Sequence, residues 1–208
     1  VYTTLFQENK MRKLFSALLF LAFALKLFSQ ESDFFGVTEI TFNEQKYVLA
    51  TATQKSKILY IQDYISEDER IEDASNVISI YYFNKEIDAK EAAYSKTEEL
   101  DNRQNSDKFC SYNVTENPNG TEFVVDYFTS NVPKSKDANA PEQESSDYNI
   151  YRFRNVLNGE KSSFMIIAYK ETYTGDTKSF QKTVGKKRNK LMEGIITLTV
   201  PDIKLKTN

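Results

Sequence analysis

The chain of 208 residues has a formal net charge of −3 and contains no His, no Trp and a single Cys. The missing His excludes His-based acid–base catalysis, the usual nucleophilic triads and the common zinc sites. One Cys cannot form an internal disulfide, so we expect Cys110 to be a half-buried apolar residue, with an intermolecular bridge or a reactive thiol as alternatives. The acidic balance argues against nucleic acid as the main partner.

The N-terminal region has the pattern of a secretory signal peptide. A short basic stretch, Met11–Lys13, precedes an apolar block from Leu14 to Leu25, and a small residue, Ser29, follows near the expected cut. The block is shorter than the roughly 20 apolar residues that span a bilayer. We therefore predict upstream residues over 1–10, a signal peptide over 11–30, a periplasmic or secreted protein, and no stable membrane span after cleavage. An uncleaved anchor and a buried helix are the alternatives.

Charge is distributed unevenly along the rest of the chain. Residues 31–147 contain 11 basic and 24 acidic residues, whereas residues 148–208 contain 12 basic and 5 acidic ones. The length suits one core, and we expect the two halves to attract each other within a single α+β domain over residues 31–208.

Four strands are predicted first: Ile40–Phe42 and Tyr47–Thr53 as a hairpin, then Ile58–Ile65 and Val77–Phe83. In the third strand, alternation makes Leu59, Ile61 and Ile65 the apolar side and leaves Tyr60, Gln62 and Tyr64 on the other.

The connector between the third and fourth strands is acidic, and we read it as a solvated turn. Its carboxylates could also hold a cation or act as a catalytic pair, although the spacing lacks the ligand pattern of an EF-hand loop. The residues concerned are Glu67, Asp68, Glu69, Glu72 and Asp73.

A helix is predicted to begin after Asp88, because Asp88 and Glu91 have the spacing of a capping box. It runs to about Arg103, and its narrow stripe of Ala89, Ala93 and Leu100 suits close packing on a sheet. Two further strands, Phe109–Thr115 and Thr121–Thr129, are joined through a turn at residues 117–120. A polar segment, Ser130–Asp147, follows as an expected flexible surface loop.

The central prediction is a hairpin over Tyr148–Tyr173, with Asn158-Gly159 forming a type I′ turn. Its second strand contains Phe164–Ala168, an apolar run without alternation, which indicates a strand covered on both faces. Arg152 and Arg154 share a parity, and we expect both to leave the core face for solvent or a loop, with an anion contact as the alternative.

A last helix is predicted from Asp176 to Glu193, ended by Gly194 and followed by a closing strand Ile195–Val200. Its buried stripe is Phe180, Val184 and Leu191, and the interior Gly185 weakens the expectation of an unbroken helix. The outer side is basic. Candidate binding residues there are Lys178, Lys182 and Lys186, which form a plain solvated face or contact anionic lipid, cell-wall polymer or an acidic partner.

Tyrosines are frequent on the predicted strands, mostly as core residues whose hydroxyls reach an edge. The alternative is a Tyr-lined ligand cavity between the sheet and the loop over residues 130–147, for which Tyr151 and Tyr169 are the candidate binding residues. No nucleophile elbow, phosphate-binding glycine loop or dinucleotide fingerprint occurs. We therefore predict no catalytic residue, no metal ligand and no cofactor.

Several segments together resemble a known group of proteins: YIQDYISEDERIEDASNVISIYYF, TEFVVDYF, YNIYRFRNV and IIAYKETYTGDTKSFQKTVGKKRNKLMEGI. They are similar to uncharacterised exported bacterial proteins with a PsbP-like (DcrB-like) α/β/α sandwich. The resemblance covers about Phe34–Val200. It implies an antiparallel sheet packed by two helices and a non-catalytic accessory role, and it carries over no functional residue.

The predicted function is therefore a non-catalytic binding or accessory module of an exported protein, with an unknown protein or envelope component as partner. The first alternative is an envelope-associated module that uses the basic last helix. The second is a hydrolase that relies on carboxylates alone, which would need a raised-pKa Asp or Glu pair in a pocket.

Overall fold

The computed structural model describes residues 33–131, 144–200, 203 and 205. The predicted signal peptide over 11–30 and the residues before it lie outside this part. So does most of the predicted loop Ser130–Asp147, whose two ends belong to strands.

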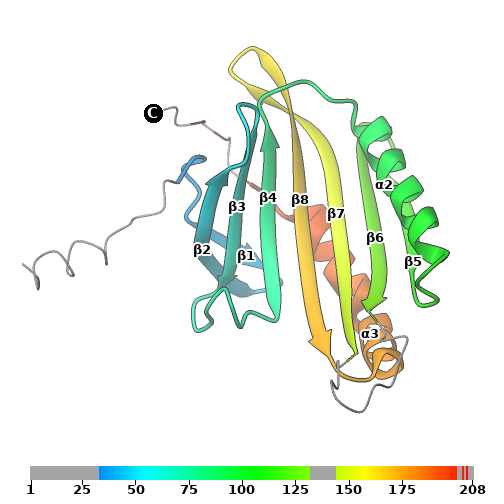
Figure 1. Cartoon of the computed structure of the whole chain (residues 1–208). Helices are drawn as coiled ribbons and strands as arrows, with labels where there is room; N and C mark the ends of the chain where they lie inside the picture. The colour runs from blue at the N-terminus through cyan, green and yellow to red at the C-terminus, as the bar shows by residue number, and fades with distance from the viewer. Residues whose placement is uncertain (1–32, 132–143, 201–202, 204, 206–208) are drawn as a thin grey trace, which may run out of the picture. The chain divides into compact units, whose positions relative to one another are not determined.

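The described residues form an eight-stranded sheet and two helices (Figure 1). The elements are β1 Glu39–Phe42, β2 Gln45–Gln54, β3 Leu59–Ser66, β4 Asn76–Phe83, α2 Ala89–Gln104, β5 Ser111–Glu116, β6 Glu122–Asn131, β7 Ser145–Asn158, β8 Lys161–Thr174 and α3 Thr177–Thr197. The sheet order is β1-β2-β3-β4-β8-β7-β6-β5, and neighbouring strands pair antiparallel. The predicted α+β class with an antiparallel sheet and two helices is confirmed.

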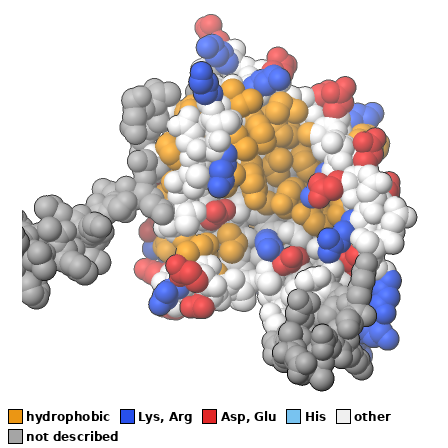
Figure 2. Space-filling view, in the orientation of Figure 1, with side chains coloured by type: hydrophobic (Ala, Val, Ile, Leu, Met, Phe, Trp, Pro, Cys, Tyr) orange, Lys and Arg blue, Asp and Glu red, His pale blue; other side chains and the backbone are white. Residues whose placement is uncertain are grey.

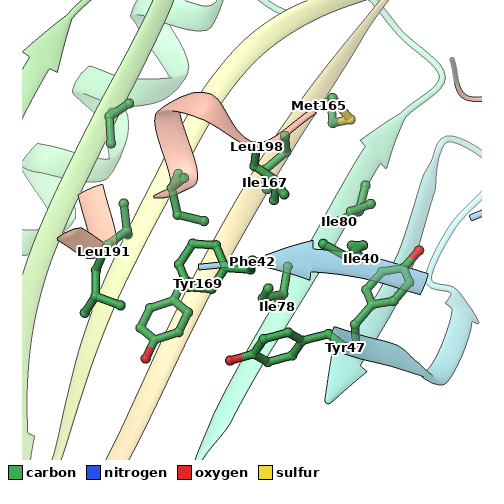
Figure 3. Packing of buried hydrophobic residues seen from close by; sticks show 14 of the residues in the cluster. Ile40, Phe42, Tyr47, Ile78, Ile80, Met165, Ile167, Tyr169, Leu191 and Leu198 are labelled. Atoms are coloured by element: carbon green, nitrogen blue, oxygen red, sulfur yellow. The ribbon is translucent and has the colours of Figure 1, made fainter. Parts of the chain in front are cut away.

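Each helix covers one face of the sheet. α2 packs on β5, β6 and β7, whereas α3 packs on β6, β7 and β8 from the other side, and we name the two surfaces the α2 face and the α3 face. In β8, Phe164 joins the core under α2, while Met165 and Ile167 join the core under α3 (Figure 3). The prediction that Phe164–Ala168 is covered on both faces is confirmed for Phe164, Met165, Ile167 and Ala168, whereas Ile166 is only half-buried.

The buried side of β3 is the one that the sequence pattern did not predict to be apolar. Tyr60, Gln62 and Tyr64 are buried on the α3 face, whereas Leu59 and Ile61 of the predicted apolar side are only half-buried and Ile65 alone of that side is buried. Gln62 tolerates this burial because its amide is fully engaged: its Oε1 accepts from the Phe34 and Phe35 N–H groups at 2.6 and 3.2 Å, and its Nε2 donates to Val37 O and Tyr64 Oη. The segment before β1 is thus fixed across the α3 face.

The turn of the central hairpin is shifted by one residue from the prediction. Asn158 pairs with Lys161, so the two turn residues are Gly159 and Glu160. Gly159 has φ +63°, and Glu160 is not among the positive-φ residues, which is the pattern of a type II′ turn rather than type I′. The type I′ pattern occurs instead in the β1–β2 turn, where Asn43 and Glu44 have φ of 48° and 70°.

Both helices begin where the sequence places them. The Asp88 carboxylate accepts from the Glu91 N–H at 2.9 Å, and the Asp176 carboxylate accepts from the Ser179 N–H at 2.8 Å. The predicted buried stripes of both helices are confirmed, and each is longer than expected, with Thr97 added in α2 and with Thr177, Met192 and Ile195 added in α3.

The predicted end of α3 at Gly194 and the closing strand Ile195–Val200 are wrong. α3 continues unbroken through Gly185 and Gly194 to Thr197, and residues 198–200 have no regular structure. Gly194 serves close packing: a Cβ there would lie 2.5 Å from Asn43 Oδ1 and 2.7 Å from Phe42 Cε2. A glycine stop signal is overridden when the residues after it are buried, here Ile195 in the last turn of α3 and Leu198 directly after the helix.

The basic and acidic halves of the chain are joined by ion pairs, as predicted. Four described ion pairs join residues before and after position 148: Arg188–Asp126, Arg152–Glu122, Arg154–Glu122 and Lys170–Asp147.

The expectation that Arg152 and Arg154 leave the core face is wrong. Both lie on the α3 face, where Arg152 is 8% exposed, because both faces of β7 are covered and neither parity leads to open solvent. Burial of Arg152 is offset by Glu122 and by the carbonyls of Ile195 and Leu198 at the end of α3.

Candidate functional site

A polar cleft of about 730 Å³ lies on the α2 face, between α2 and the central strands. Tyr81 of β4, Tyr127 of β6 and Tyr151 of β7 contribute to its wall, so we name it the tyrosine cleft. Helix α2 supplies the opposite wall, and β8 contributes one lysine. Its lining is Tyr81, Lys96, Glu99, Leu100, Asn102, Arg103, Tyr127, Thr129, Asp147, Asn149, Tyr151 and Lys170.

The three tyrosines are in mutual contact around Tyr151. The ring centroids of Tyr127 and Tyr151 are 5.4 Å apart at 67°, an edge-to-face contact, and those of Tyr81 and Tyr151 are 6.2 Å apart. Burial raises the pKa of both Tyr81 and Tyr127, and the charge of Tyr151 and hydrogen bonding to it raise each pKa further. The phenols of Tyr81 and Tyr127 are therefore neutral hydrogen-bonding groups at physiological pH.

Lys96 connects α2 to this cluster. Its ammonium lies 4.8 Å from the Tyr127 ring centroid and 5.4 Å from that of Tyr151, within range for cation–π attraction. The same ammonium donates to the Glu99 carboxylate at 2.9 and 3.0 Å. Lys96 is thereby held over the aromatic rings rather than extended into solvent.

The cations of the cleft are paired with carboxylates. Lys96 pairs with Glu99, Lys170 pairs with Asp147 at 3.3 Å, and Arg103 pairs with Asp107 at 3.4 Å. The cleft is therefore a surface of mixed sign around an aromatic centre, and it has no concentration of uncompensated positive charge that would select an anion.

Beside the cleft, the α2 face carries an apolar strip that no described helix covers. Ile61, Tyr81 and Ile166 occupy one register row across β3, β4 and β8, and Leu59 and Phe83 occupy the next row toward the end of the sheet. All five are half-buried. Figure 2 shows hydrophobic side chains gathered on this face beside α2. We name these five residues the open strip.

Tyr151 and Tyr169, which the sequence analysis places in one ligand cavity, lie on opposite faces of the sheet. Tyr151 lines the tyrosine cleft, but Tyr169 lies on the α3 face, 3% exposed, with its hydroxyl donating at 2.9 Å to Asn76 Oδ1 and lying 3.0 Å from the Glu171 carboxylate. Tyr169 is therefore a core residue in this structure and does not share a cavity with Tyr151.

The three candidate lysines of the last helix, Lys178, Lys182 and Lys186, are exposed on α3, and none forms an ion pair with another described residue. Two neighbours behave differently. Lys187 binds the Glu171 carboxylate at 2.5 Å, and Arg188 binds Asp126 through two hydrogen bonds of 2.7 and 2.6 Å.

Sequence reasoning missed Lys96 and did not single out Tyr81 and Tyr127 as site residues. All three lie on elements that were placed correctly. Their convergence depends on strand order. β8 and β7, the last two strands along the chain, lie between β4 and β6 in the sheet, and all four strands contribute to the cleft. No local pattern in the chain encodes that neighbourhood.

The described carboxylates do not form a convergent buried pair. Asp107 and Asp126 are the buried ones among the described residues. Burial alone would raise the pKa of Asp107, but hydrogen bonds from Ser130, Phe109 and Arg103 together hold that pKa below its usual value. Asp126 is bound by Arg188. Both therefore stabilise the fold, and the arrangement required by the hydrolase alternative is not found in this part of the chain.

The remaining candidates lie away from the cleft. The acidic connector between β3 and β4 is largely exposed, and no group of three or more His, Cys, Asp or Glu residues suited to a metal ion occurs within the described ranges. Cys110 is buried, more than expected, and burial raises the pKa of its thiol. Within the same ranges, helices long and apolar enough to cross a membrane are not found.

Comparison with known proteins gives one match. The model of an uncharacterised family matches residues 35–200, which include all ten described elements. Neither the curated proteins nor the solved structures contain a significant match.

Proposed function

For a chain that belongs to this uncharacterised family over residues 35–200, we propose a non-catalytic binding module that holds a partner polypeptide on the α2 face. The tyrosine cleft and the open strip form the contact surface. Export to the periplasm or beyond, and kinship with the PsbP-like sandwich domains, belong to the same proposal and rest on the sequence patterns of the leader and of the strands.

The observation that carries the proposal is the incomplete helical layer on the α2 face. α2 covers β5, β6 and β7, whereas the half-buried apolar residues of β3, β4 and β8 have no described helix above them. Three strands are about 14 Å wide at a spacing of about 4.8 Å, and a helix with its side chains is about 10–12 Å in diameter. The open strip therefore has room for one amphipathic helix beside α2.

The composition of the surface agrees with a protein contact. Protein interfaces have an apolar centre rich in Tyr and a polar rim, and contiguous apolar patches on a soluble protein mark such sites. Here the apolar centre is the open strip, and the paired charges Lys96–Glu99 and Lys170–Asp147 form the rim on one side. We expect the partner helix to carry charges of both signs along its polar face.

A peptide selection tests the proposal. A phage library of 18-residue peptides is selected on wild-type protein, and binding of the enriched peptides is measured by fluorescence anisotropy with the variants Ile61→Lys and Ile166→Lys. We expect amphipathic helical peptides whose affinity falls about tenfold or more with either variant, because a charge is placed at the apolar centre of the contact.

The matched control is Ile196→Lys, which places the same charge at an exposed apolar residue of α3. It should leave peptide affinity within about twofold of wild type. Circular dichroism and thermal melting confirm that each variant is folded. Failure to enrich any peptide, or enriched peptides that bind the Ile61→Lys and Ile166→Lys proteins as tightly as wild type, would overturn the proposal.

A second candidate function rests on α3. Lys178, Lys182 and Lys186 are exposed and form no described ion pair, in contrast to Lys187 and Arg188, so their charge is available to an anionic surface. Polybasic segments near anionic lipid gain about 1 kcal/mol per basic residue. This candidate places the protein on an envelope surface through α3 while the α2 face stays free.

Sedimentation with vesicles tests this candidate. Wild-type protein should bind phosphatidylglycerol vesicles and be released by salt, and the triple variant Lys178→Glu, Lys182→Glu, Lys186→Glu should lose that binding. The control reverses Lys85, Lys90 and Lys108, which lie in or next to α2 and are also exposed. Equal sedimentation of the two triple variants would rule the candidate out.

A further inference from the structure

A second cavity lies on the other side of the sheet, at the turn end of the central hairpin. Its volume is about 460 Å³, within the range of about 300–1,000 Å³ that is typical of small-molecule sites. The apolar wall consists of Val156, Met165, Val200 and Ile203, and the polar groups include Arg154 and Ser162. The cavity is separate from the tyrosine cleft, with which it shares no lining residue.

Two guanidinium groups next to this cavity share one carboxylate. Arg152 takes most of it: its Nε donates to Glu122 Oε2 at 2.8 Å and its Nη2 lies 2.6 Å from the same oxygen, while its Nη1 donates to the Ile195 and Leu198 carbonyls. Arg154 reaches Glu122 only at 3.5 Å, too long for a good hydrogen bond. The two arginines and Glu122 therefore carry one net positive charge, and Arg154 is the arginine whose Nε lacks a hydrogen bond.

Unpartnered buried polar atoms gather at the same end of the α3 face. Three side-chain atoms of the described residues are buried without a hydrogen-bond partner: Arg154 Nε, Tyr82 Oη and Ser163 Oγ. Met165, in the cavity wall, pairs in register with Arg154 on one side and with Tyr82 on the other. Ser163 pairs with Val156, also in the wall. Each such group is destabilising unless a partner satisfies it.

We infer that this cavity binds a small amphiphile with an anionic oxygen group, carboxylate or phosphate, on an apolar chain. The guanidinium of Arg154 receives the anionic head, since its planar fork matches both groups. Val156, Met165, Val200 and Ile203 surround the chain. The excess positive charge and the apolar wall are both needed, so neither a free inorganic anion nor a neutral amphiphile fits as well.

Calorimetric titration with matched probes tests the inference. Decanoate and decyl phosphate represent the two head groups, decanol lacks the charge, and inorganic phosphate lacks the chain. Wild-type protein should bind at least one of the two charged amphiphiles about tenfold or more tightly than decanol, because a charge-assisted hydrogen bond is lost with decanol. Decanoate alone would assign a carboxylate ligand, and decyl phosphate alone a phosphate ligand.

Two substitutions locate the site. Arg154→Gln should weaken binding of the charged amphiphile about tenfold, and Val200→Phe should block the cavity without altering the charge. Arg70→Gln is the matched control, because Arg70 is an exposed arginine of the β3–β4 connector. Decanol binding equal to that of the charged probes, full binding by Arg154→Gln, or no binding by either charged probe would overturn the inference. None of these results bears on the peptide contact of the α2 face.

Discussion

Asp126 on β6 shows how one buried charge fixes a helix to the sheet. The residue is 2% exposed, and both carboxylate oxygens accept from Arg188 of α3, with the Tyr148 hydroxyl at 3.3 Å. The hydrogen bonds to Asp126 raise the pKa of Arg188. Because a bidentate pair has a preferred geometry, it sets the rotation of α3 about its axis, and this leaves Lys178, Lys182 and Lys186 outward.

The substitution Asp126→Asn should lower the free energy of unfolding by about 2–3 kcal/mol. Breaking a buried pair costs about 3–5 kcal/mol, and the cost is smaller here because a third of the Arg188 side chain is exposed. Urea unfolding measures the effect. The control is Glu39→Gln, which removes an exposed pair with Lys46 and should leave the urea midpoint almost unchanged. Equal midpoints for the two variants would contradict this interpretation.

The helix α3 contains two glycines with opposite roles. A Cβ on Gly185 would meet nothing within 4 Å, whereas a Cβ on Gly194 would collide with Phe42 and Asn43 of the β1–β2 hairpin. Gly194 therefore allows α3 to lie against β1, and this contact closes the core around Phe42, Ile195 and Tyr169. The same residue type marks a solvent-facing position in one place and a packing requirement in the other.

Alanine substitution of the two glycines should change stability in opposite directions. Gly185→Ala should stabilise by about 0.5–1 kcal/mol through helix propensity. Gly194→Ala gains the same propensity but forces overpacking that costs about 1–3 kcal/mol, so its net effect should be destabilising. Thermal melting measures both, with about 2–4 °C expected per kcal/mol for a chain of this size. Stabilisation by Gly194→Ala would show that the hairpin moves away without cost.

In the described unit as a whole, the α3 face of the sheet is more fully covered by other parts of the chain than the α2 face. On the α3 face, helix α3, the segment before β1 and β1 itself cover the sheet from β2 to β8. On the α2 face, a single helix of 16 residues covers three strands and leaves the open strip. Four ion pairs join the acidic and basic halves of the chain.

Local patterns in the sequence were sufficient for most of the elements. Alternation, the apolar run Phe164–Ala168 and the caps Asp88 and Asp176 each reflect interactions within a few residues, and the structure confirms the elements that they predict. The turn of the central hairpin was misplaced by one residue, which is a local error. Other errors occurred where distant contacts decide. Arg152 was expected in solvent but is buried by α3, and Gly194 was expected to end a helix that continues because Ile195 finds a buried site.

The candidate sites were predictable only in part. Tyr151 was named from the sequence, but its partners Tyr81, Tyr127 and Lys96 come from three other elements, and Tyr169, only 18 positions along the hairpin, lies on the opposite face. Strand order is set by which apolar surfaces cover one another across the whole chain. The sequence by itself therefore determined the elements and their periodicity, because these depend on neighbours along the chain. Only the tertiary structure decided which residues meet in the tyrosine cleft and which arginine is left underpaired, because long-range packing sets both.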